Sequence, residues 1–406
     1  MKRDKPLYYV KTTGTSGEAK LIPIYISQDN ANFFFNNKKE IIYNLIQGKI
    51  SFFMLLDHIE YYDGIEVSNA VTRQFKKIFD SYLSYFIFRY ISATPFYLYK
   101  NVNHSMDQNL IYALLNKNLT IIFTYFLRSC LENLDKILFN FSYYLNIIKN
   151  INYDRFIELN IIYSDILNKE DSKDWLYKVW PYLKIIICGS SGIYNLYKPR
   201  IKYYAKDIII WSPYCGCTEM IYGLNDNLYS DTYKFNYKQG NYYKDMIIDN
   251  KYIRLKVDTI NGLNNYLIDD LIKFTNLNTN EFIYEGRYNF YNELKITERE
   301  FALIFNTENY IYDVLLIKQD DDNNKSYILV IETYNDKKLP LYMINNLKMY
   351  INITYIKYTH GKFDNLIDYI KDTSSNKILF REQIKLPRIL DYKNEKHQEY
   401  IKILIN

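Results

Sequence analysis

The sequence predicts an α/β protein whose large N-terminal domain ends in a β-rich part and is followed by a small α+β domain. Three observations support this fold class. Two short apolar runs, 183–188 and 207–211, each lead into a polar loop, as buried parallel strands do. Short strand patterns dominate from Tyr242 onward. The segment 314–371 then has the pattern of a hairpin followed by helix, strand and helix.

The N-terminal half carries mainly helical patterns before the two apolar runs. Apolar residues at i, i+3 and i+4 predict a helix over 74–83, and 106–149 has a mostly helical pattern. The run 183–188 ends at the loop Gly189–Gly192. Because ligands of α/β sheets bind at the carboxyl ends of parallel strands, this loop is placed near a site.

The C-terminal elements follow from local signals. Strands are expected at 245–248, 252–257, 271–274 and 281–284. Thr297 and Glu300 have capping-box spacing, which predicts a helix through Ile304. The later elements are a hairpin of 314–318 with 327–331, a helix at 341–350, a strand at 353–358 and a helix at 363–371. A domain boundary near 288–294 divides the chain into domains 1–288 and 289–406.

Composition excludes several classes of protein. The net charge of +5 has no clustered basic patch, which argues against a nucleic-acid partner. No stretch approaches the ~18 apolar residues of a membrane span, and four cysteines fit a reducing, cytoplasmic compartment. The 46 tyrosines indicate an A/T-rich genome, as in a protist or a large DNA virus. If the source is a virus, we expect the protein in the host cytoplasm. We expect a monomer that acts on small molecules.

The stretch 12–20 is the most informative in the chain. Gly14 and Gly17 allow backbone N–H groups to converge on one point, and Thr13, Thr15, Ser16 and Lys20 add hydroxyl and ammonium donors, which together would suit a polyphosphate. The spacing is not that of a Walker loop. The alternative is a solvated loop between two strands.

Two further polar segments follow strands. Thr218 could place a hydroxyl on a phosphate, and Glu219 a carboxylate on magnesium. Asp270, in the segment 262–270 between two strands, could accept from both ribose hydroxyls. The alternatives are an exposed polar turn for the first segment and a hairpin turn with solvated acids for the second.

Taken in order, these motifs resemble the adenylate-forming superfamily, and more narrowly the acyl acid–amido synthetases of the plant auxin-responsive Gretchen Hagen family. The resemblance rests on five stretches: Thr13–Gly17 with Lys20–Pro23, Thr218–Glu219 with Gly223, Gly262–Leu263 with Tyr266 and Asp270, Gly361–Tyr369, and Gln383–Arg388. These matches run from Thr12 to Arg388. Several ordered motifs are far more specific than any one of them.

The resemblance implies an adenylate-forming fold, with 1–288 as the adenylation domain and 289–406 as a small mobile domain. It implies ATP and Mg²⁺ as cofactors, and a small carboxylic acid and an amine or amino acid as substrates. The implied phosphate ligands are the residues of the glycine-rich loop, Thr13, Gly14, Thr15, Ser16, Gly17 and Lys20. The other implied site residues are Thr218 for the α-phosphate, Glu219 for magnesium, Tyr266 and Asp270 for the nucleoside, Arg287 at the hinge, and catalytic Lys385.

The chain also departs from the family pattern. Cys215 stands where an aromatic residue is expected, and the family usually has a longer segment before its phosphate loop. Asn264, Asn265 and Leu267 replace Tyr and two Arg of the ribose motif. Two alternatives to an amide-forming enzyme therefore stay open: a relative that binds nucleotide or acid without turnover, and a ligase that transfers the acyl group to a thiol such as coenzyme A.

Overall fold

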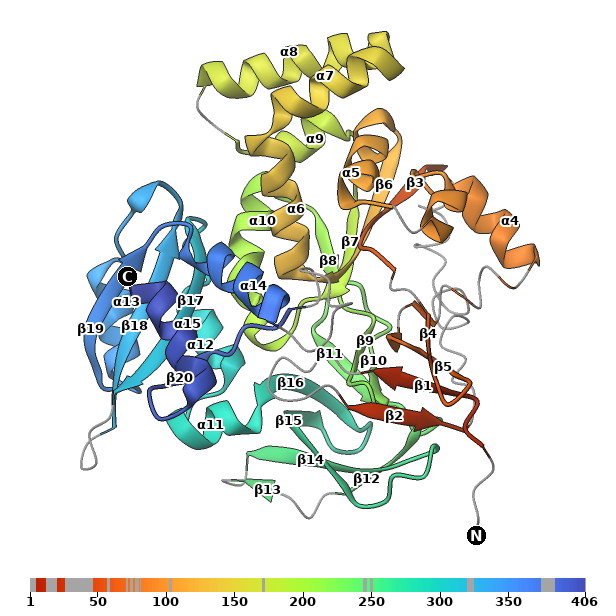
Figure 1. Cartoon of the computed structure of the whole chain (residues 1–406). Coiled ribbons are helices and arrows are strands. Elements are labelled where there is room, and N and C mark those ends of the chain that lie inside the picture. Colours follow the sequence, from red (N-terminus) through yellow and green to blue (C-terminus); the bar gives the residue numbers. More distant parts are fainter. Residues whose placement is uncertain are drawn as a thin grey trace. The chain divides into compact units, whose positions relative to one another are not determined.

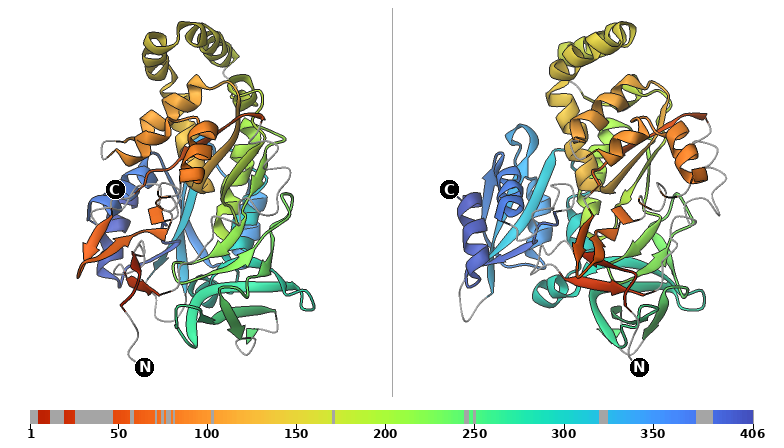
Figure 2. Two further views of the ribbon diagram at one scale, coloured as in Figure 1. Left: turned by 90° about the vertical axis from the view of Figure 1, so that its right-hand side faces the viewer. Right: turned by 45° about the vertical axis from the view of Figure 1, so that its right-hand side comes forward.

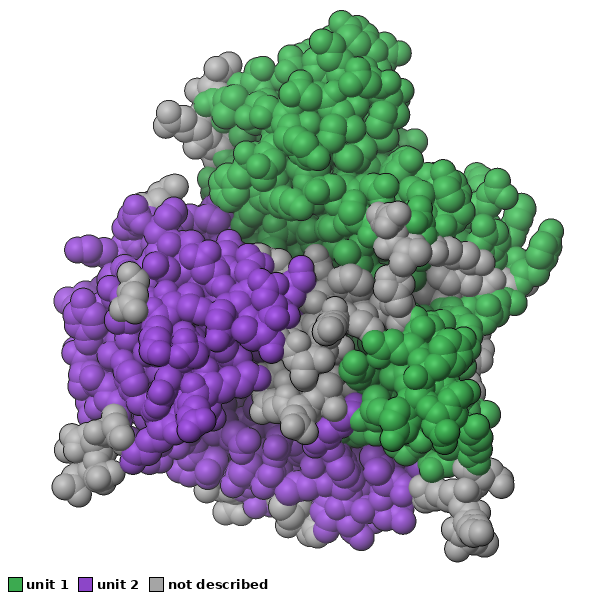
Figure 3. Space-filling model, viewed as in Figure 1, with its two compact units in different colours: residues 1–11, 21–190, 201–231 green, residues 12–20, 191–200, 232–406 purple. Residues whose placement is uncertain are grey.

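The computed structural model describes residues 5–11, 20–25, 47–56, 59–70, 72–73, 76, 80, 82–101, 104–169, 172–243, 247–248, 251–319, 325–373 and 384–405. The chain forms two compact units (Figure 3). Unit 1 comprises Met1–Lys11, Leu21–Ser190 and Ile201–Asp231, and unit 2 comprises Thr12–Lys20, Ser191–Arg200 and Thr232–Asn406. In the described part of the chain, no helix combines the length and the apolar character that a membrane crossing requires. The boundary predicted at 288/289 falls at the start of α11, inside unit 2.

Unit 1 is built around a parallel sheet in the order β3-β6-β7-β8 (Figure 1). Its strands are β3 (Lys49–Phe53), β6 (Leu119–Phe126), β7 (Ile185–Gly189) and β8 (Ile209–Trp211). The parallel strands predicted at 183–188 and 207–211 are thus confirmed. The prediction that 106–149 is mostly helical needs one correction, because β6 interrupts the helices. A central strand buried on both faces is continuously apolar, and its pattern alone does not distinguish it from a buried helix.

Helices cover this sheet, and α5 and α6 pack directly on β3 and β6. The described helices of unit 1 that follow β5 are α4 (Tyr82–Ile91), η1 (Phe96–Lys100), α5 (Met106–Leu115), α6 (Leu127–Phe139), α7 (Phe141–Ile151), α8 (Tyr153–Lys169) and α9 (Trp175–Val179). The short helix η2 (Gly192–Tyr197) belongs to unit 2, and α10 (Lys198–Tyr204) follows it and ends in unit 1. A capping box of Ser105 and Gln108 begins α5. The helix predicted over 74–83 lies mostly outside the described residues.

Two smaller β elements complete unit 1. One is a sheet in the order β2-β1-β5-β4, formed by β1 (Tyr8–Lys11), β2 (Leu21–Ile24), β4 (Glu60–Tyr62) and β5 (Ile65–Ser68). The other is the antiparallel hairpin of β9 (Tyr214–Gly216) and β10 (Ile221–Leu224). Each leads to a sequence-predicted site segment: β1 precedes the loop 12–20, and β9 precedes Thr218 and Glu219.

Unit 2 contains the antiparallel strands β12-β14-β15-β16-β11, in that spatial order, with β13 paired to β14. Their bounds are β11 (Thr232–Phe235), β12 (Gly240–Tyr243), β13 (Ile247–Ile248), β14 (Tyr252–Thr259), β15 (Tyr266–Asn276) and β16 (Glu281–Arg287). The strands predicted at 252–257, 271–274 and 281–284 are confirmed. Of the strand predicted at 245–248, only β13 lies in the described part of the chain.

A second sheet in unit 2 has the order β19-β18-β17-β20. Its elements are α11 (Tyr288–Leu294), α12 (Glu298–Ile304), β17 (Ile311–Gln319), β18 (Ser326–Thr333), η3 (Tyr334–Asp336), α13 (Leu341–Lys348), β19 (Ile353–Thr359), α14 (Lys362–Thr373), β20 (Ile389–Asp391) and α15 (Glu395–Ile405). The predicted capping box, hairpin, helices and strand are confirmed. Helix α14 packs on α15, and α15 on β20 (Figure 2). Their core includes Leu315, Phe363 and Tyr400.

Candidate active site

The phosphate loop predicted at Thr13, Gly14, Thr15, Ser16 and Gly17 lies outside the described residues. The strands that flank it are described. Lys11 of β1 is the register partner of Leu21 of β2, so the loop leaves one strand and enters its antiparallel neighbour at adjoining positions. Lys20, which ends the loop, is exposed to solvent.

Thr218 and Glu219 lie in the tight turn between β9 and β10. The turn is closed by a hydrogen bond from Cys217 N–H to the Met220 carbonyl oxygen at 2.9 Å. Gly216 is required here, because a Cβ at this position would lie 2.6 Å from that same oxygen. Glu219 is 8% exposed and Thr218 is half-buried. The sequence left open that this segment is an exposed polar turn, but Glu219 is buried.

Cys215, which replaces an expected aromatic residue, is buried in the same hairpin. Its Sγ donates to the hydroxyl of Tyr222 at 3.3 Å. Tyr222 itself is fully buried, so an aromatic ring packs against the cysteine from the neighbouring strand. The substitution leaves a filled hairpin core.

Asp270 lies near the middle of β15 and is 2% exposed. Its register partner on β16 is Arg287, whose Nη1 lies 2.9 Å from Asp270 Oδ1. The Tyr284 hydroxyl donates to the same oxygen at 3.4 Å. The side chain of Arg287 is 42% exposed. The structure therefore places Asp270 beside Arg287, two residues that the sequence analysis named separately. The alternative that Asp270 is a solvated acid in a hairpin turn is wrong, because it is buried.

The neighbours of Asp270 on β15 have different surroundings. Asp269 points to the other face of the strand, as alternation requires, and pairs with Arg254. Tyr266, at the first position of β15, is half-buried and opposite Val257. Asp269 thus offers a carboxylate of the same chemistry one residue from Asp270 but outside the candidate site.

Lys385 lies in an extended segment, 384–388, that leads into β20. Burial alternates along it: Ile384, Leu386 and Arg388 are buried, whereas Lys385 and Pro387 are half-buried. Ile384 and Leu386 belong to the core beneath α14 and α15. Lys385 therefore projects from the opposite side of the segment, away from this core.

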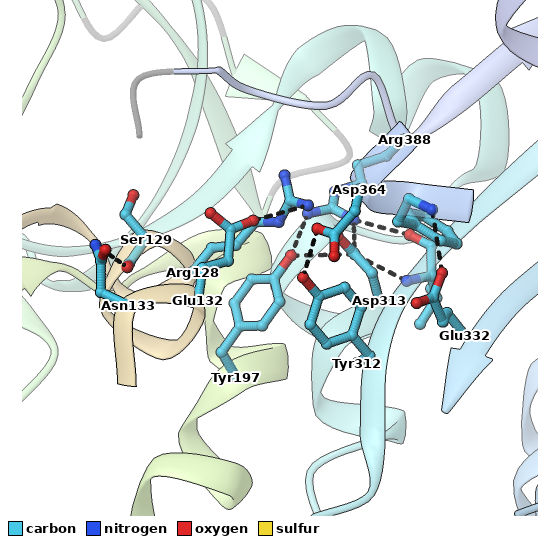
Figure 4. A network of polar contacts seen from close by, with 12 residues as sticks. Arg128, Ser129, Glu132, Asn133, Tyr197, Tyr312, Asp313, Glu332, Asp364 and Arg388 are labelled. Carbon is cyan, nitrogen blue, oxygen red and sulfur yellow. Dashed lines mark hydrogen bonds and ion pairs between the residues drawn. The ribbon is translucent and has the colours of Figure 1, made fainter. Parts of the chain in front are cut away.

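A buried network surrounds Arg388 (Figure 4). Its guanidinium forms an ion pair with Asp313 of β17 and donates to the Val314 carbonyl oxygen at 2.8 Å. It also donates to the Tyr197 hydroxyl at 2.7 Å, and this hydroxyl donates to Asp313 Oδ1 at 3.0 Å. The sequence reasoning missed Tyr197 and Asp313. The available signals were Arg388 in the C-terminal motif and a lone aspartate that opens an apolar strand.

Glu298, also missed, lies in the first turn of α12 and is 8% exposed. Burial raises the pKa of its carboxyl, and the charges of Arg287 and Arg388 oppose this rise. Gly286 allows the close approach: its φ is +125°, and a Cβ there would lie 2.5 Å from the Glu298 Cβ. Acidic and basic groups therefore continue from Asp270 through Arg287 and Glu298 to Arg388.

The C-terminal motif at Gly361–Tyr369 organises the fold. Glu332 of β18 accepts from the N–H groups of Gly361 at 2.9 Å and of Phe363 at 3.1 Å, which caps the start of α14. Phe363 and Leu366 are fully buried in the core. This motif supports the sheet on which the 384–388 segment rests.

The comparisons with known proteins identify the family. The model described as the GH3 family N-terminal domain matches residues 1–210, which is more than half of the 406 residues. The chain belongs to the GH3 family. No curated protein matches this GH3 chain in sequence.

Solved structures show the fold of this GH3 chain. It is similar to "GH3.15 acyl acid amido synthetase" with a TM-score of 0.71 and 17% identity, covering 98% of this chain and 82% of that one. A second structure, "AtGH3.15 acyl acid amido synthetase in complex with 2,4-DB", gives the same values. A 2-hydroxyisobutyryl-CoA ligase in its postadenylation state has a TM-score of 0.44 and 8% identity, covering 98% and 76%. The fold class expected from the sequence, that of an adenylate-forming enzyme, is confirmed.

The donor set fits a magnesium-bound nucleotide. Magnesium is usually held by one or two carboxylates together with substrate phosphates, and Glu219 is a single buried carboxylate beside a hydroxyl. Across the described ranges, no group of three or more His, Cys, Asp and Glu side chains is placed to hold a metal by itself. Asp270 adds a buried acceptor of the kind that ribose hydroxyls require.

Proposed function

We propose that this GH3 chain is an ATP-dependent acyl acid–amido synthetase, which activates a small carboxylic acid and joins it to an amine or amino acid. Membership of the GH3 family supports the proposal, as does the likeness of its fold to a protein named as an acyl acid amido synthetase. We also propose that it acts as a monomer in the cytoplasm, in keeping with its four free cysteines.

The reaction has two steps. A carboxylate oxygen of the acid attacks the α-phosphorus of ATP, and pyrophosphate leaves with the electrons of the broken P–O bond. The amine nitrogen then attacks the acyl carbon, AMP departs, and the nitrogen loses a proton as the amide forms. Both steps build negative charge on phosphate oxygens, so fixed donors and correct alignment supply most of the catalysis.

The residues have separate tasks in this proposal. Thr13, Thr15, Ser16 and Lys20 donate to the phosphates, with Gly14 and Gly17 providing backbone N–H groups. Thr218 donates to the α-phosphate, and Glu219 holds magnesium, which neutralises phosphate charge when bound. Tyr266 and Asp270 hold the nucleoside, with Arg287 beside them at the hinge.

Lys385 is the proposed catalytic cation. Carried by the mobile domain 289–406, its ammonium approaches the reacting carboxylate and phosphate when that domain closes. Its half-buried position on the face of 384–388 opposite the core of α14 and α15 supports this role.

The observation that carries the site assignment is the Asp270–Arg287 pair. Asp270 is buried, yet its partner Arg287 remains 42% exposed, so the arginine side of the pair faces solvent. A carboxylate held in this way can accept two ribose hydroxyls.

The test is acid-dependent exchange of labelled pyrophosphate into ATP, across a panel of small carboxylic acids. Asp270→Asn is compared with Asp269→Asn, a matched control one residue away that pairs instead with Arg254. We expect exchange by the wild type, and an ATP KM raised about 10- to 100-fold by Asp270→Asn alone, as befits loss of a charged acceptor. Glu219→Ala should abolish exchange.

Two results would redirect the proposal. Measurable ATP binding without exchange for any acid would identify a binding protein that has lost turnover. Exchange followed by product formation with coenzyme A, and none with amino acids, would identify a thiol ligase.

A further inference from the structure

The segment 384–388 is fixed by its last residue through both backbone and side chain. The carbonyl oxygen of Arg388 accepts from the Leu316 N–H of β17 at 2.9 Å. Its guanidinium binds Asp313, Val314 O and the Tyr197 hydroxyl. A planar fork with several partners has one allowed orientation, unlike a single-point ammonium contact.

The Tyr197 hydroxyl completes this clamp. It accepts from Arg388 and donates to Asp313, so one oxygen bridges both members of the ion pair. Tyr197 is 1% exposed and ends η2, which packs on α12, β16 and β17. At the start of η2, Gly192 has φ +61°, and a Cβ there would lie 2.7 Å from the Tyr284 ring. The hydroxyl is therefore presented by a tightly seated element.

A buried ion pair such as Asp313–Arg388 contributes little net stability to a fold. Replacing a buried ion pair with apolar side chains is often neutral or stabilising, because desolvating two charges costs as much as their attraction returns. Several directional hydrogen bonds to one planar guanidinium do, however, restrict its orientation. What the Arg388 network specifies is the path of the chain three residues after Lys385.

We propose that Arg388 is a positioning residue for Lys385, and that Tyr197 and Asp313 are the clamp that holds it. With Arg388 fixed at one end and Ile384 and Leu386 anchored in the core, the backbone of Lys385 has a defined orientation and its side chain leaves on the face opposite that core. The inference rests on the catalytic role proposed for Lys385.

Tyr197→Phe tests the clamp, since it removes only the bridging oxygen. Tyr327→Phe is the matched control: Tyr327 is a buried tyrosine of β18 whose hydroxyl donates to a different carboxylate, Glu293, at 2.7 Å. Hydrogen–deuterium exchange of the peptide 384–391 is measured in both, followed by pyrophosphate exchange. Arg388→Lys, which keeps the charge and loses the fork, serves as a second variant if Tyr197→Phe does not fold.

We expect the amides of 384–391 to exchange about tenfold faster in Tyr197→Phe than in the wild type, as loss of a hydrogen bond to a charged group implies, and Tyr327→Phe to match the wild type there. In kinetics, kcat should fall about tenfold with the ATP KM within about twofold of wild type. Unchanged amide exchange would overturn the inference, as would faster exchange with unaltered kcat. If the wild type forms no adenylate, the proposed function fails, while amide exchange still decides whether the clamp holds the segment.

Discussion

Two of the aspartate–arginine pairs in unit 2 differ mainly in their access to water. Asp270 and Arg287 are register partners on β15 and β16, whereas Asp313 of β17 pairs with Arg388 just before β20. Both aspartates are buried. The side chain of Arg287 is 42% exposed, and that of Arg388 only 4%.

We relate this difference in exposure to the two proposed roles, a ligand-binding pair and a structural pair. Around Arg388, protein groups replace part of the lost water: Asp313, Val314 O and the Tyr197 hydroxyl accept from its two Nη atoms. Arg287 stays partly exposed to solvent. In our proposal, the half-exposed pair is a binding position and the closed pair holds the chain in one orientation.

The largest effect should come from breaking the closed pair. Arg388→Ala would leave Asp313 buried without its partner, and such losses cost about 3–5 kcal/mol. The free energy of unfolding, measured in urea, should fall by that amount. A double variant with Asp313→Leu and Arg388→Met should recover much of it. If Arg388→Ala lowered the free energy of unfolding by no more than Arg287→Ala does, the distinction between the closed and the open ion pair would be wrong.

Gly286→Ala tests the crowded joint between the two pairs. The new Cβ would meet Glu298 at 2.5 Å on a backbone with φ +125°, and we expect a loss of about 1–3 kcal/mol in the free energy of unfolding. Gly361→Ala is the control, because Gly361 also has positive φ (+64°) but open space around it. If the two variants lose equal stability, the close approach to Glu298 contributes nothing.

Arg287→Ala addresses the open pair. Arg287 is partly exposed but Asp270 is buried and keeps only the Tyr284 hydroxyl among its two named partners, so the free energy of unfolding should fall by about 1–2 kcal/mol, less than for Arg388→Ala. The ATP KM should nevertheless rise about tenfold, because Asp270 loses the cation that orients it. A variant that is strongly destabilised but binds ATP normally would reverse the roles that we assign to the two pairs.

Glu298→Gln should change the free energy of unfolding least, by an amount that depends on pH. Burial raises the pKa of Glu298 in the folded protein, so its neutral form is favoured there. This contribution to stability is complete below the ordinary glutamate pKa, about 4.3, and is lost as pH rises through the raised value. Glutamine does not titrate, so the stability of the variant relative to wild type should increase across this window and then level off. A difference that is constant with pH would contradict the assignment.

Local signals predicted many elements of the fold. The Thr297–Glu300 capping box begins α12, and the hairpin of β17 and β18 formed where two strand patterns flank a polar turn. Strand β6 was hidden inside a region with a helical pattern, since its buried apolar run has no period that excludes a helix. Such ambiguity is removed only by the parallel neighbours β3 and β7.

The sequence by itself determined the family resemblance, the order of the site segments and the residue types at Glu219, Asp270 and Lys385, because short motifs are read within a few positions of one another. Only the tertiary structure decided that Asp270 is buried beside Arg287, and that Tyr197 meets Arg388 across 191 positions of chain. Contacts at that separation depend on how strands and helices pack. No local pattern of charge or hydrophobicity carries that information.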